Sequence, residues 1–367
     1  MNPDQNTAAG EIGEVLKHYD LGTLVGLDRN DRGYLNTSYA VEVFKGGDQK
    51  KYFLRRYKSG IQADEIRFEH GLINHLLRQD FNLVASIFNT KDGETYLSLP
   101  APDMPGQIAY YTIFEFLPGD DKYTWIDPHC SSKEVGNSAA LLANYHQAVN
   151  GFTPPGQRND PKIIELIPVL INFLENCIKR SKNSKFDAHL QENLGLFLCN
   201  CLQMQQIFSQ TTLTELPQLV VHGDFHPGNL KFSGEEIVAL FDFDWSKIDL
   251  RCFDIGLGIW YFFTSWEAQQ DGILRCGEAG QFLDKYQRTA ARLTGLEPLN
   301  PQELGLLPVM VNLGNLYVLN WLVVDFYAKS VDVDEYLMYL QHNVNFARWF
   351  STSGQSLMLE TFTKDPG

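Results

Sequence analysis

The chain has 367 residues, 44% of them hydrophobic and 20% charged, which is enough to build the core of two domains or of one two-lobed domain. Lys and Arg number 30 and Asp and Glu number 45, so the formal net charge is −15. This charge repels phosphate backbones and anionic lipid, so we expect no nucleic acid and no membrane among the partners.

Residues 1–10, MNPDQNTAAG, lack the basic start and apolar core of a signal peptide and are predicted to form a disordered tail. No two cysteines have C-x-x-C spacing, and for Cys199 and Cys201 a leucine-rich helix is a simpler interpretation than a zinc site. We therefore expect reduced thiols and a cytoplasmic protein. The cysteines are Cys130, Cys177, Cys199, Cys201, Cys252 and Cys276.

Short alternating runs bounded by turn formers predict a strand-rich region that extends to residue 117. One helix, residues 63–79, interrupts it. The predicted strands are residues 23–27, 37–44, 50–57, 82–89, 95–99 and 110–117.

After the break at LPGDD, long helices are predicted at residues 131–149, 161–180 and 188–208, and helices continue to the end after a β-hairpin near residues 230–242. The apolar stretch 304–327 contains too many polar residues for a membrane span and is predicted to form buried helices. The chain is therefore predicted to be α+β and bilobal. Residues 1–117 would form a small sheet lobe and residues 118–367 a larger helical lobe, with the ligand in the cleft between them.

The segment VVHGDFHPGNLKF, residues 220–232, places polar side chains in a tight loop directly after a buried apolar strand. Pro227 and Gly228 force a turn, and NLKF and IVALFDF read as the strands of the hairpin. Counting back from its turn, Phe232 faces about Ile237 and Asn229 faces about Leu240.

This register brings Asp242 just past Asn229, at the open end of the hairpin. Amide and carboxylate oxygens are suited to Mg²⁺, which keeps waters and also takes phosphate oxygens. Asp224, five residues before Asn229, could accept a proton from an attacking hydroxyl. Asp and Asn also cap turns, but the three residues together favour chemistry over capping.

HGDFHPGN followed by FDFDW resembles the superfamily of aminoglycoside phosphotransferases, choline kinases and type II homoserine kinases. The resemblance spans most of the chain and implies a protein-kinase-like fold that uses ATP and Mg²⁺. It makes Asp224 the catalytic base and Asn229 and Asp242 the metal ligands, with Asp244 as a further candidate.

Other polar residues near the motif have expected structural roles. By the same likeness, His222 is expected to hold the loop. Asp254 is expected to tie the loop to the start of a helix. A zinc pair of His222 and His226 is disfavoured because Pro227 breaks any shared helical face.

Glu69 lies inside the apolar stripe of the helix at 63–79, where a carboxylate is costly unless a cation meets it. The preceding strand offers Arg55 and Arg56, which point to opposite faces. A glutamate at the edge of the stripe that reaches water is the alternative. In the superfamily a strand Lys or Arg pairs with a helix Glu and contacts the nucleotide phosphates. Arg55 fits that place best, and Arg56 is the second choice.

Other nucleotide contacts are predicted less directly. DRGYLNTSYAVEV has a single glycine, Gly33, and backbone amides or hydroxyls near Asn36 and Ser38 are the candidates for the phosphate-covering turn. TIFEFLPGDD is predicted to form the hinge, with the backbone near Glu115 and Phe116 placed for adenine.

Three other functions fit the sequence less well. A protein kinase would carry H-R-D, D-F-G and A-P-E, whereas this chain has HGD and DFD. A metallophosphatase would need more metal motifs after GDFH. A non-catalytic binding module would not need Asp224, Asn229 and Asp242 together.

The expected acceptor is a small hydroxylated metabolite that bears an amine, most similar to homoserine or an amino alcohol. CFDIGLGIWYFFTSWE and the chain length resemble type II homoserine kinases. Aminoglycosides, amino sugars, choline and ethanolamine are the alternatives. The acceptor pocket is expected on the helical lobe, near residues 130–150, 255–270 and 310–330.

Overall fold

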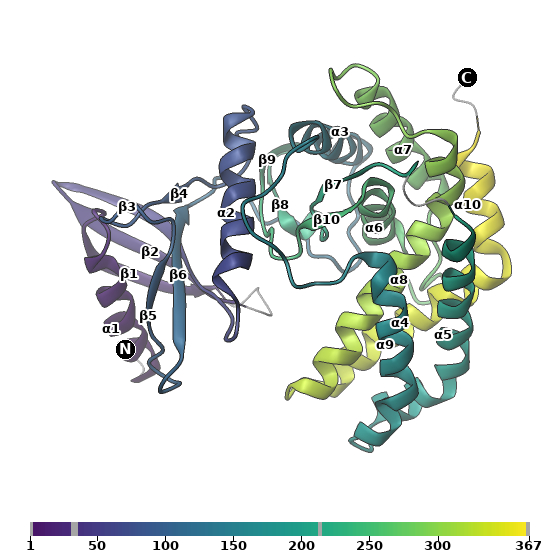
Figure 1. The fold of residues 1–367 in the computed structure, drawn as a ribbon, viewed down its shortest axis with the longest axis horizontal. Coiled ribbons are helices and arrows are strands. Elements are labelled where there is room, and N and C mark those ends of the chain that lie inside the picture. Colours follow the sequence, from purple (N-terminus) through teal and green to yellow (C-terminus); the bar gives the residue numbers. More distant parts are fainter. Residues whose placement is uncertain (1–2, 31–35, 212–214, 365–367) are drawn as a thin grey trace. The chain divides into compact units, whose positions relative to one another are not determined.

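The computed structural model describes residues 3–30, 36–211 and 215–364. They form two compact units, which are described separately (Figure 1). The first comprises residues 1–119 and 153–158, and the second comprises residues 120–152 and 159–367. The first unit is built on an antiparallel sheet and the second is mainly helical, so the predicted α+β class is confirmed.

The sheet of the first unit runs in the order β1-β2-β3-β6-β4, and β5 pairs with β6. Residues of its buried core alternate along the strands, and they include Val41 on β2, Leu54 on β3 and Ile113 on β6. The helix α2 (Ala63–Arg78) begins with a capping box between Gln62 and Glu65. The strands are β1 (Thr23–Asn30), β2 (Thr37–Lys45), β3 (Asp48–Arg56), β4 (Ile87–Phe88), β5 (Leu97–Pro100) and β6 (Ile108–Glu115).

The predicted disordered tail is wrong over its described part, because the helix α1 (Pro3–Lys17) begins there. Ile12, Val15 and Leu16 recur at helical spacing and are buried in the core of the sheet unit. That apolar stripe stabilises the helix despite the polar residues that precede it.

The predicted strand 82–89 is also mostly wrong, since only β4, Ile87–Phe88, pairs with the sheet. Asp80 has a positive φ of 58°, and the chain turns there after α2. Phe81 and Val84 are buried beside this turn, so the apolar residues that suggested a strand pack without forming one.

Residues 153–158 belong to the first compact unit, whereas the predicted boundary put everything after residue 117 in the second lobe. The guanidinium of Arg158 lies 5.4 Å from the ring centroid of Phe68 on α2. This contact joins a segment far along the chain to the unit that contains α2.

The second unit packs its helices around two small antiparallel pairs, β7 with β10 and β8 with β9. The strongest helix contacts join α6 to α8, α3 to α7 and α5 to α9. Short 3₁₀ or π segments lie at Ile178–Arg180, Pro227–Asn229 and Phe350–Gly354. The other elements are α3 (Ser132–Ala148), α4 (Ile163–Cys177), α5 (Lys185–Gln210), β7 (Gln218–Val221), β8 (Leu230–Ser233), β9 (Glu236–Leu240), β10 (Lys247–Leu250), α6 (Arg251–Phe263), α7 (Cys276–Ala290), α8 (Pro301–Ala328), α9 (Val333–Trp349) and α10 (Gln355–Phe362).

In the described chain one helix, α8, is long and apolar enough to cross a bilayer by length and composition alone. Its most apolar window is 83% buried inside the protein. Packing against other helices therefore accounts for its apolar residues, as the sequence predicted for residues 304–327.

Candidate active site

The buried strand β7 delivers the chain into the Asp224 loop, which we define as His222–Asn229. Gly223 turns the chain with φ of 76°, and a Cβ there would lie 2.4 Å from the carbonyl oxygen of Trp245. Both facts require glycine at this position. The partner strand β10, Lys247–Leu250, was missed because the sequence analysis expected only helices after the hairpin.

Both carboxylate oxygens of Asp224 accept hydrogen bonds. Oδ1 accepts from the hydroxyl of Tyr261 at 2.9 Å, and Oδ2 accepts from Nδ2 of Asn229 at 2.9 Å. Nε2 of His226 lies 3.4 Å from Oδ2. Burial raises the pKa of Asp224, but His226, His222 and the Tyr261 hydroxyl outweigh it and hold the pKa below its usual range. The side chain is therefore an ionised, oriented acceptor at neutral pH.

The two histidines of the loop hold it through their ring nitrogens. Nδ1 of His222 accepts from the backbone N–H of Asp224 at 3.3 Å, and its Nε2 donates to the carbonyl of Phe241 at 3.2 Å. Nδ1 of His226 accepts from the N–H of Gly228 at 3.0 Å, which leaves its Nε2–H to face Asp224. His222 thus holds the loop, as expected.

Asp254 on α6 holds the backbone at the start of the Asp224 loop. Its carboxylate accepts hydrogen bonds from the backbone N–H groups of His222 at 2.8 Å and Gly223 at 2.9 Å. Nε2 of His146 lies 3.0 Å from the same carboxylate. Burial raises the pKa of Asp254, but His146, His222 and the backbone N–H of Gly223 together outweigh it and hold the pKa below its usual range. The expected link between loop and helix is confirmed, and its extension to His146 on α3 was not foreseen.

The hairpin brings Asn229 and Asp242, the two predicted metal ligands, close together along the backbone. The pairing of β8 with β9 differs by one residue from the predicted register. Phe232 pairs with Ile237, as expected, but Leu240 pairs with Leu230 and not with Asn229. The register shifts between Lys231 and Phe232, where Val238 of β9 is the extra residue of a β-bulge. The N–H of Phe241 donates to the carbonyl of Asn229 at 3.1 Å, so Asp242 follows directly beside Asn229.

The donor set here fits a magnesium ion. Nδ2 of Asn229 donates to the carbonyl oxygen and to Oδ2 of Asp224, so its amide oxygen is the atom that could bind a metal. Asp242 has φ of 67°, a conformation rare for a non-glycine residue and often found at functional sites. Within the described residues no three His, Cys, Asp or Glu side chains cluster to hold a metal. Two protein ligands suit Mg²⁺, because it retains waters and binds substrate phosphates.

In the first unit, Glu69 has the cationic partner that the sequence analysis predicted. Nη1 of Arg55 lies 2.9 Å from Oε1 of Glu69, and their side chains are only 10% and 2% exposed. The hydroxyl of Tyr57 donates to Oε2 of Glu69 at 2.9 Å and lies 3.0 Å from Nε2 of His70. Burial lowers the pKa of His70 to about 3, so its ring is neutral. We call these four residues the Arg55 cluster.

Arg56 points elsewhere, with ion pairs to Glu11 at 3.5 Å and to Asp103. Of the two candidates, Arg55 is therefore the partner of Glu69. Its contact with nucleotide phosphates remains a prediction.

The predicted phosphate-covering turn is described only in part, because Gly33 lies outside the described residues. The amide oxygen of Asn36 accepts the backbone N–H of Lys58 at 2.9 Å, and Ser38 is buried on β2. Asn36 thus has a structural role in the turn, and contact of either residue with nucleotide stays a prediction.

The predicted hinge begins at the end of β6. The N–H of Glu115 donates to the carbonyl of Ser86 at 2.8 Å, and its carboxylate accepts the Ser86 hydroxyl at 2.5 Å. The Glu115 N–H is therefore engaged, and contact of the backbone near Glu115 and Phe116 with adenine stays a prediction. Phe116 is 38% exposed, with Nζ of Lys51 4.6 Å from its ring centroid.

Sequence reasoning missed a group of aromatic rings in the second unit, which we call the tryptophan cluster: Trp125, Trp266, Trp321 and Tyr339. The ring centroid of Trp125 lies 5.5 Å from that of Trp266, 6.4 Å from Trp321 and 4.8 Å from Tyr339. It also lies 6.2 Å from the ring of Tyr261, which contacts Asp224. The tryptophans are partly exposed. Trp125 falls outside the predicted pocket ranges.

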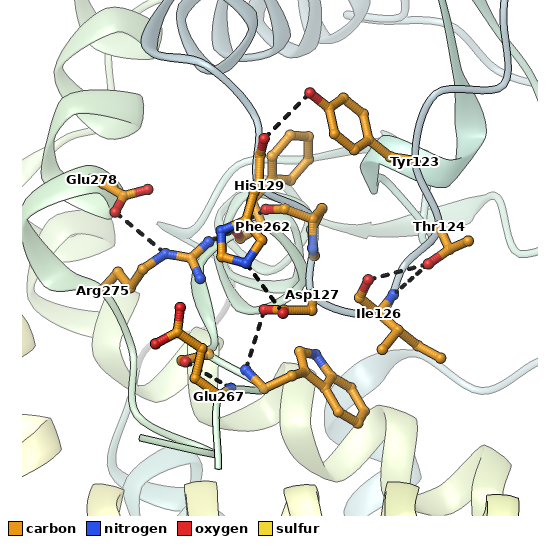
Figure 2. A network of polar contacts seen from close by, with 12 residues as sticks. Tyr123, Thr124, Ile126, Asp127, His129, Phe262, Glu267, Arg275 and Glu278 are labelled. Carbon is orange, nitrogen blue, oxygen red and sulfur yellow. Dashed lines mark hydrogen bonds and ion pairs between the residues drawn. The ribbon is translucent and has the colours of Figure 1, made fainter. Parts of the chain in front are cut away.

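Asp127 orders the segment that carries Trp125. Its carboxylate accepts hydrogen bonds from Nε2 of His129 at 3.1 Å and from the backbone N–H of Trp266 at 3.4 Å (Figure 2). Its φ of 45° is another unusual value for a non-glycine residue. One carboxylate thus fixes Trp266 relative to the loop that bears Trp125.

Comparison with known proteins identifies the family. Residues 27–296 match the model of the phosphotransferase enzyme family. The chain belongs to this family. A homoserine kinase of Bradyrhizobium sp. (strain ORS 278) is 26% identical over 305 residues, which cover 83% of this chain and 81% of the relative.

Solved structures of two kinases share the fold. The microcompartment-associated aminopropanol kinase superposes with a TM-score of 0.66 at 16% identity, covering 96% of this chain and 99% of the other. An amicoumacin kinase in complex with AMP-PNP and Ca²⁺ gives a TM-score of 0.62 at 18% identity, covering 94% and 96%. The resemblance drawn from HGDFHPGN and FDFDW is confirmed, and the chain is a small-molecule kinase.

Proposed function

We propose that this phosphotransferase moves the γ-phosphoryl group of ATP to a hydroxyl of a small, amine-bearing metabolite, with Mg²⁺ as cofactor. The preferred acceptor is a homoserine-like amino acid or an amino alcohol. The observation that carries the proposal is the arrangement of Asp224, Asn229 and Asp242, in which a fixed carboxylate adjoins a pair of oxygen ligands.

Asp224 is the group that would meet the acceptor hydroxyl. Because its pKa is held low, it is a weak base, and its main contribution is to orient the hydroxyl for in-line attack and to take the proton as the bond to phosphorus forms. Asn229 and Asp242 would hold Mg²⁺, which neutralises charge on the transferring phosphates when bound.

The Arg55 cluster would steady the phosphates of the nucleotide. Glu69 and Tyr57 fix the Arg55 side chain, so little side-chain entropy remains to be lost when a phosphate binds. An ordered, planar guanidinium can offer two parallel N–H donors to phosphate oxygens.

An amine-bearing acceptor is supported by the surroundings of Asp224. The tryptophan cluster reaches Asp224 through Tyr261, and aromatic faces attract ammonium groups. The net charge of −15 also favours a cationic acceptor. A relative named homoserine kinase supports the amino-acid version of this proposal. Aminoglycosides, amino sugars, choline and ethanolamine are the competing acceptors.

A cytoplasmic location is part of the same proposal. All six cysteines are present as thiols in the structure, which supports a reducing compartment.

The proposal is tested by ADP release from ATP across a panel of hydroxyl-bearing amines and amino acids, including homoserine, ethanolamine, choline and one aminoglycoside. We expect acceptor-dependent ADP release that stops when Mg²⁺ is chelated. Release of phosphate from a monoester without ATP would instead indicate a phosphatase. ATP binding without turnover on any acceptor would indicate a binding module.

A further inference from the structure

The hydroxyl of Tyr261 makes a hydrogen bond to Asp224 that no sequence motif predicted. Tyr261 lies on α6, is 9% exposed, and donates to Oδ1 of Asp224 at 2.9 Å. It stands in the apolar run LGIWYFF, where a tyrosine reads as one more core aromatic. Burial raises the pKa of Tyr261 well above its ordinary value, so its hydroxyl keeps the proton that it donates.

The donors to Asp224 come from two different parts of the fold. Asn229 and His226, on Oδ2, belong to the Asp224 loop itself, so they move with it. Tyr261, on Oδ1, comes from α6, whose Asp254 also holds the loop backbone. The carboxylate is therefore fixed against rotation from the loop on one oxygen and from the helix on the other.

The ring of Tyr261 is itself held in place. Its centroid lies 4.9 Å from that of His226, 5.2 Å from Trp260 and 6.2 Å from Trp125. Neighbouring rings on several sides restrict the side-chain rotamer, and a restricted donor directs its acceptor more sharply than a mobile one.

We propose that Tyr261 is a positioning residue for phosphoryl transfer, which holds the Asp224 carboxylate in the orientation that receives the acceptor hydroxyl. It acts through Asp224 and on no phosphate. This inference rests on the proposed function. Through Tyr261, α6 determines the orientation of the Asp224 carboxylate. The tryptophan cluster lies next to Tyr261.

The test is Tyr261→Phe, which removes the hydroxyl and keeps the ring. We expect kcat to fall on the order of 10-fold, because a misplaced reacting group costs rate. The KM values for ATP and for the acceptor should stay within about twofold, since neither substrate loses a contact. A kcat within about twofold of wild type would overturn the inference.

Tyr327→Phe is the matched control. The hydroxyl of Tyr327 on α8 also donates to a carboxylate in the same unit, Oδ1 of Asp187 on α5, at 2.8 Å. The Tyr327→Phe variant should leave kcat unchanged. An equal fall of kcat in both variants would mean that loss of any tyrosine hydroxyl bound to a carboxylate lowers the rate, and would overturn the specific role of Tyr261.

A crystal structure of Tyr261→Phe separates failure of the inference from failure of the proposed function. If wild type turns over no acceptor on the panel, the proposed function fails, but the Asp224 side chain can still be observed. We expect its carboxylate to be rotated or disordered relative to wild type. An unchanged carboxylate in a protein without turnover would overturn the inference as well.

Discussion

Two carboxylates of this kinase, Asp224 and Glu69, lie in different surroundings. Asp224 in the second unit accepts hydrogen bonds from a hydroxyl and an amide, lies 3.4 Å from an imidazole nitrogen, and has a side chain that is 16% exposed. Glu69 in the first unit faces the guanidinium of Arg55 and is 2% exposed. The first arrangement leaves a carboxylate that can meet a substrate, and the second consumes most of the charge in a fixed pair.

The difference predicts where each residue is needed. Removing Asp224 takes away an acceptor whose donors can find other partners or water, so folding should change little. Removing Glu69 leaves the charge of Arg55 buried without its partner, which is costly for the fold. Substitution of Asp224 should therefore lower activity with little loss of stability, whereas substitution of Glu69 should lower stability as well.

The largest expected effect is that of Asp224→Ala. We expect kcat to fall on the order of 10²–10⁴-fold, since both the orientation of the hydroxyl and the proton acceptor are lost. The midpoint of thermal unfolding should change little. Steady-state turnover with the best acceptor measures the first quantity, and turnover like that of wild type would remove Asp224 from the mechanism.

Glu69→Gln, unlike Asp224→Ala, should lower stability. We expect a loss of about 3 kcal/mol in the free energy of unfolding, measured with urea, because the charge of Arg55 stays buried. Asp64→Asn on the same helix is the control, since its pair with Arg67 is half exposed and should contribute nothing measurable. Equal stability of the two variants would contradict the assignment of a buried ion pair.

A smaller effect distinguishes the two arginines of β3. Arg55→Lys keeps the charge but loses the planar fork, so we expect the KM for ATP to rise on the order of 10-fold. Arg56→Lys should leave it unchanged, because Arg56 is engaged with Glu11 and Asp103. A rise in KM for Arg56→Lys alone would transfer the phosphate contact to Arg56.

A further effect is a pH dependence of stability, which His70 of the Arg55 cluster confers. The pKa of His70 is about 3 in the folded protein and about 6.5 when unfolded, so the unfolded state binds the proton first. Its contribution to stability is complete above pH 6.5 and is lost as the pH falls towards 3. The free energy of unfolding should drop by about 2 kcal/mol from this group between pH 7 and pH 5. His70→Gln should remove that part of the drop, and an unchanged drop would contradict a neutral, buried His70.

Much of the fold and site could be predicted from local patterns. The stripe of α2 with Glu69 inside it required a cation, and the strand before it offered Arg55. The spacing of Asp224 and Asn229 and the hairpin after them indicated one shared site. These signals lie within a few dozen residues of each other, where strand and helix periods determine which side chains meet.

The rest depended on contacts that sequence spacing does not encode. Trp125, Trp266 and Trp321 come from segments far apart in the chain, and each alone looks like an ordinary core aromatic. Tyr261 was hidden in an apolar run in the same way. The bulge at Val238 changed the hairpin register, and counting from the turn could not foresee it.

The turn at Gly223 limits how this enzyme can be altered by laboratory evolution. In a saturation library we expect every replacement of Gly223 to be inactive, because it has φ of 76° and a Cβ would displace the Trp245 carbonyl that lies behind it. Gly234, at the hairpin turn, has a similar φ of 64° and open space around it, so asparagine should survive there. New acceptor preferences are therefore better sought in the tryptophan cluster than in the loop that bears Asp224.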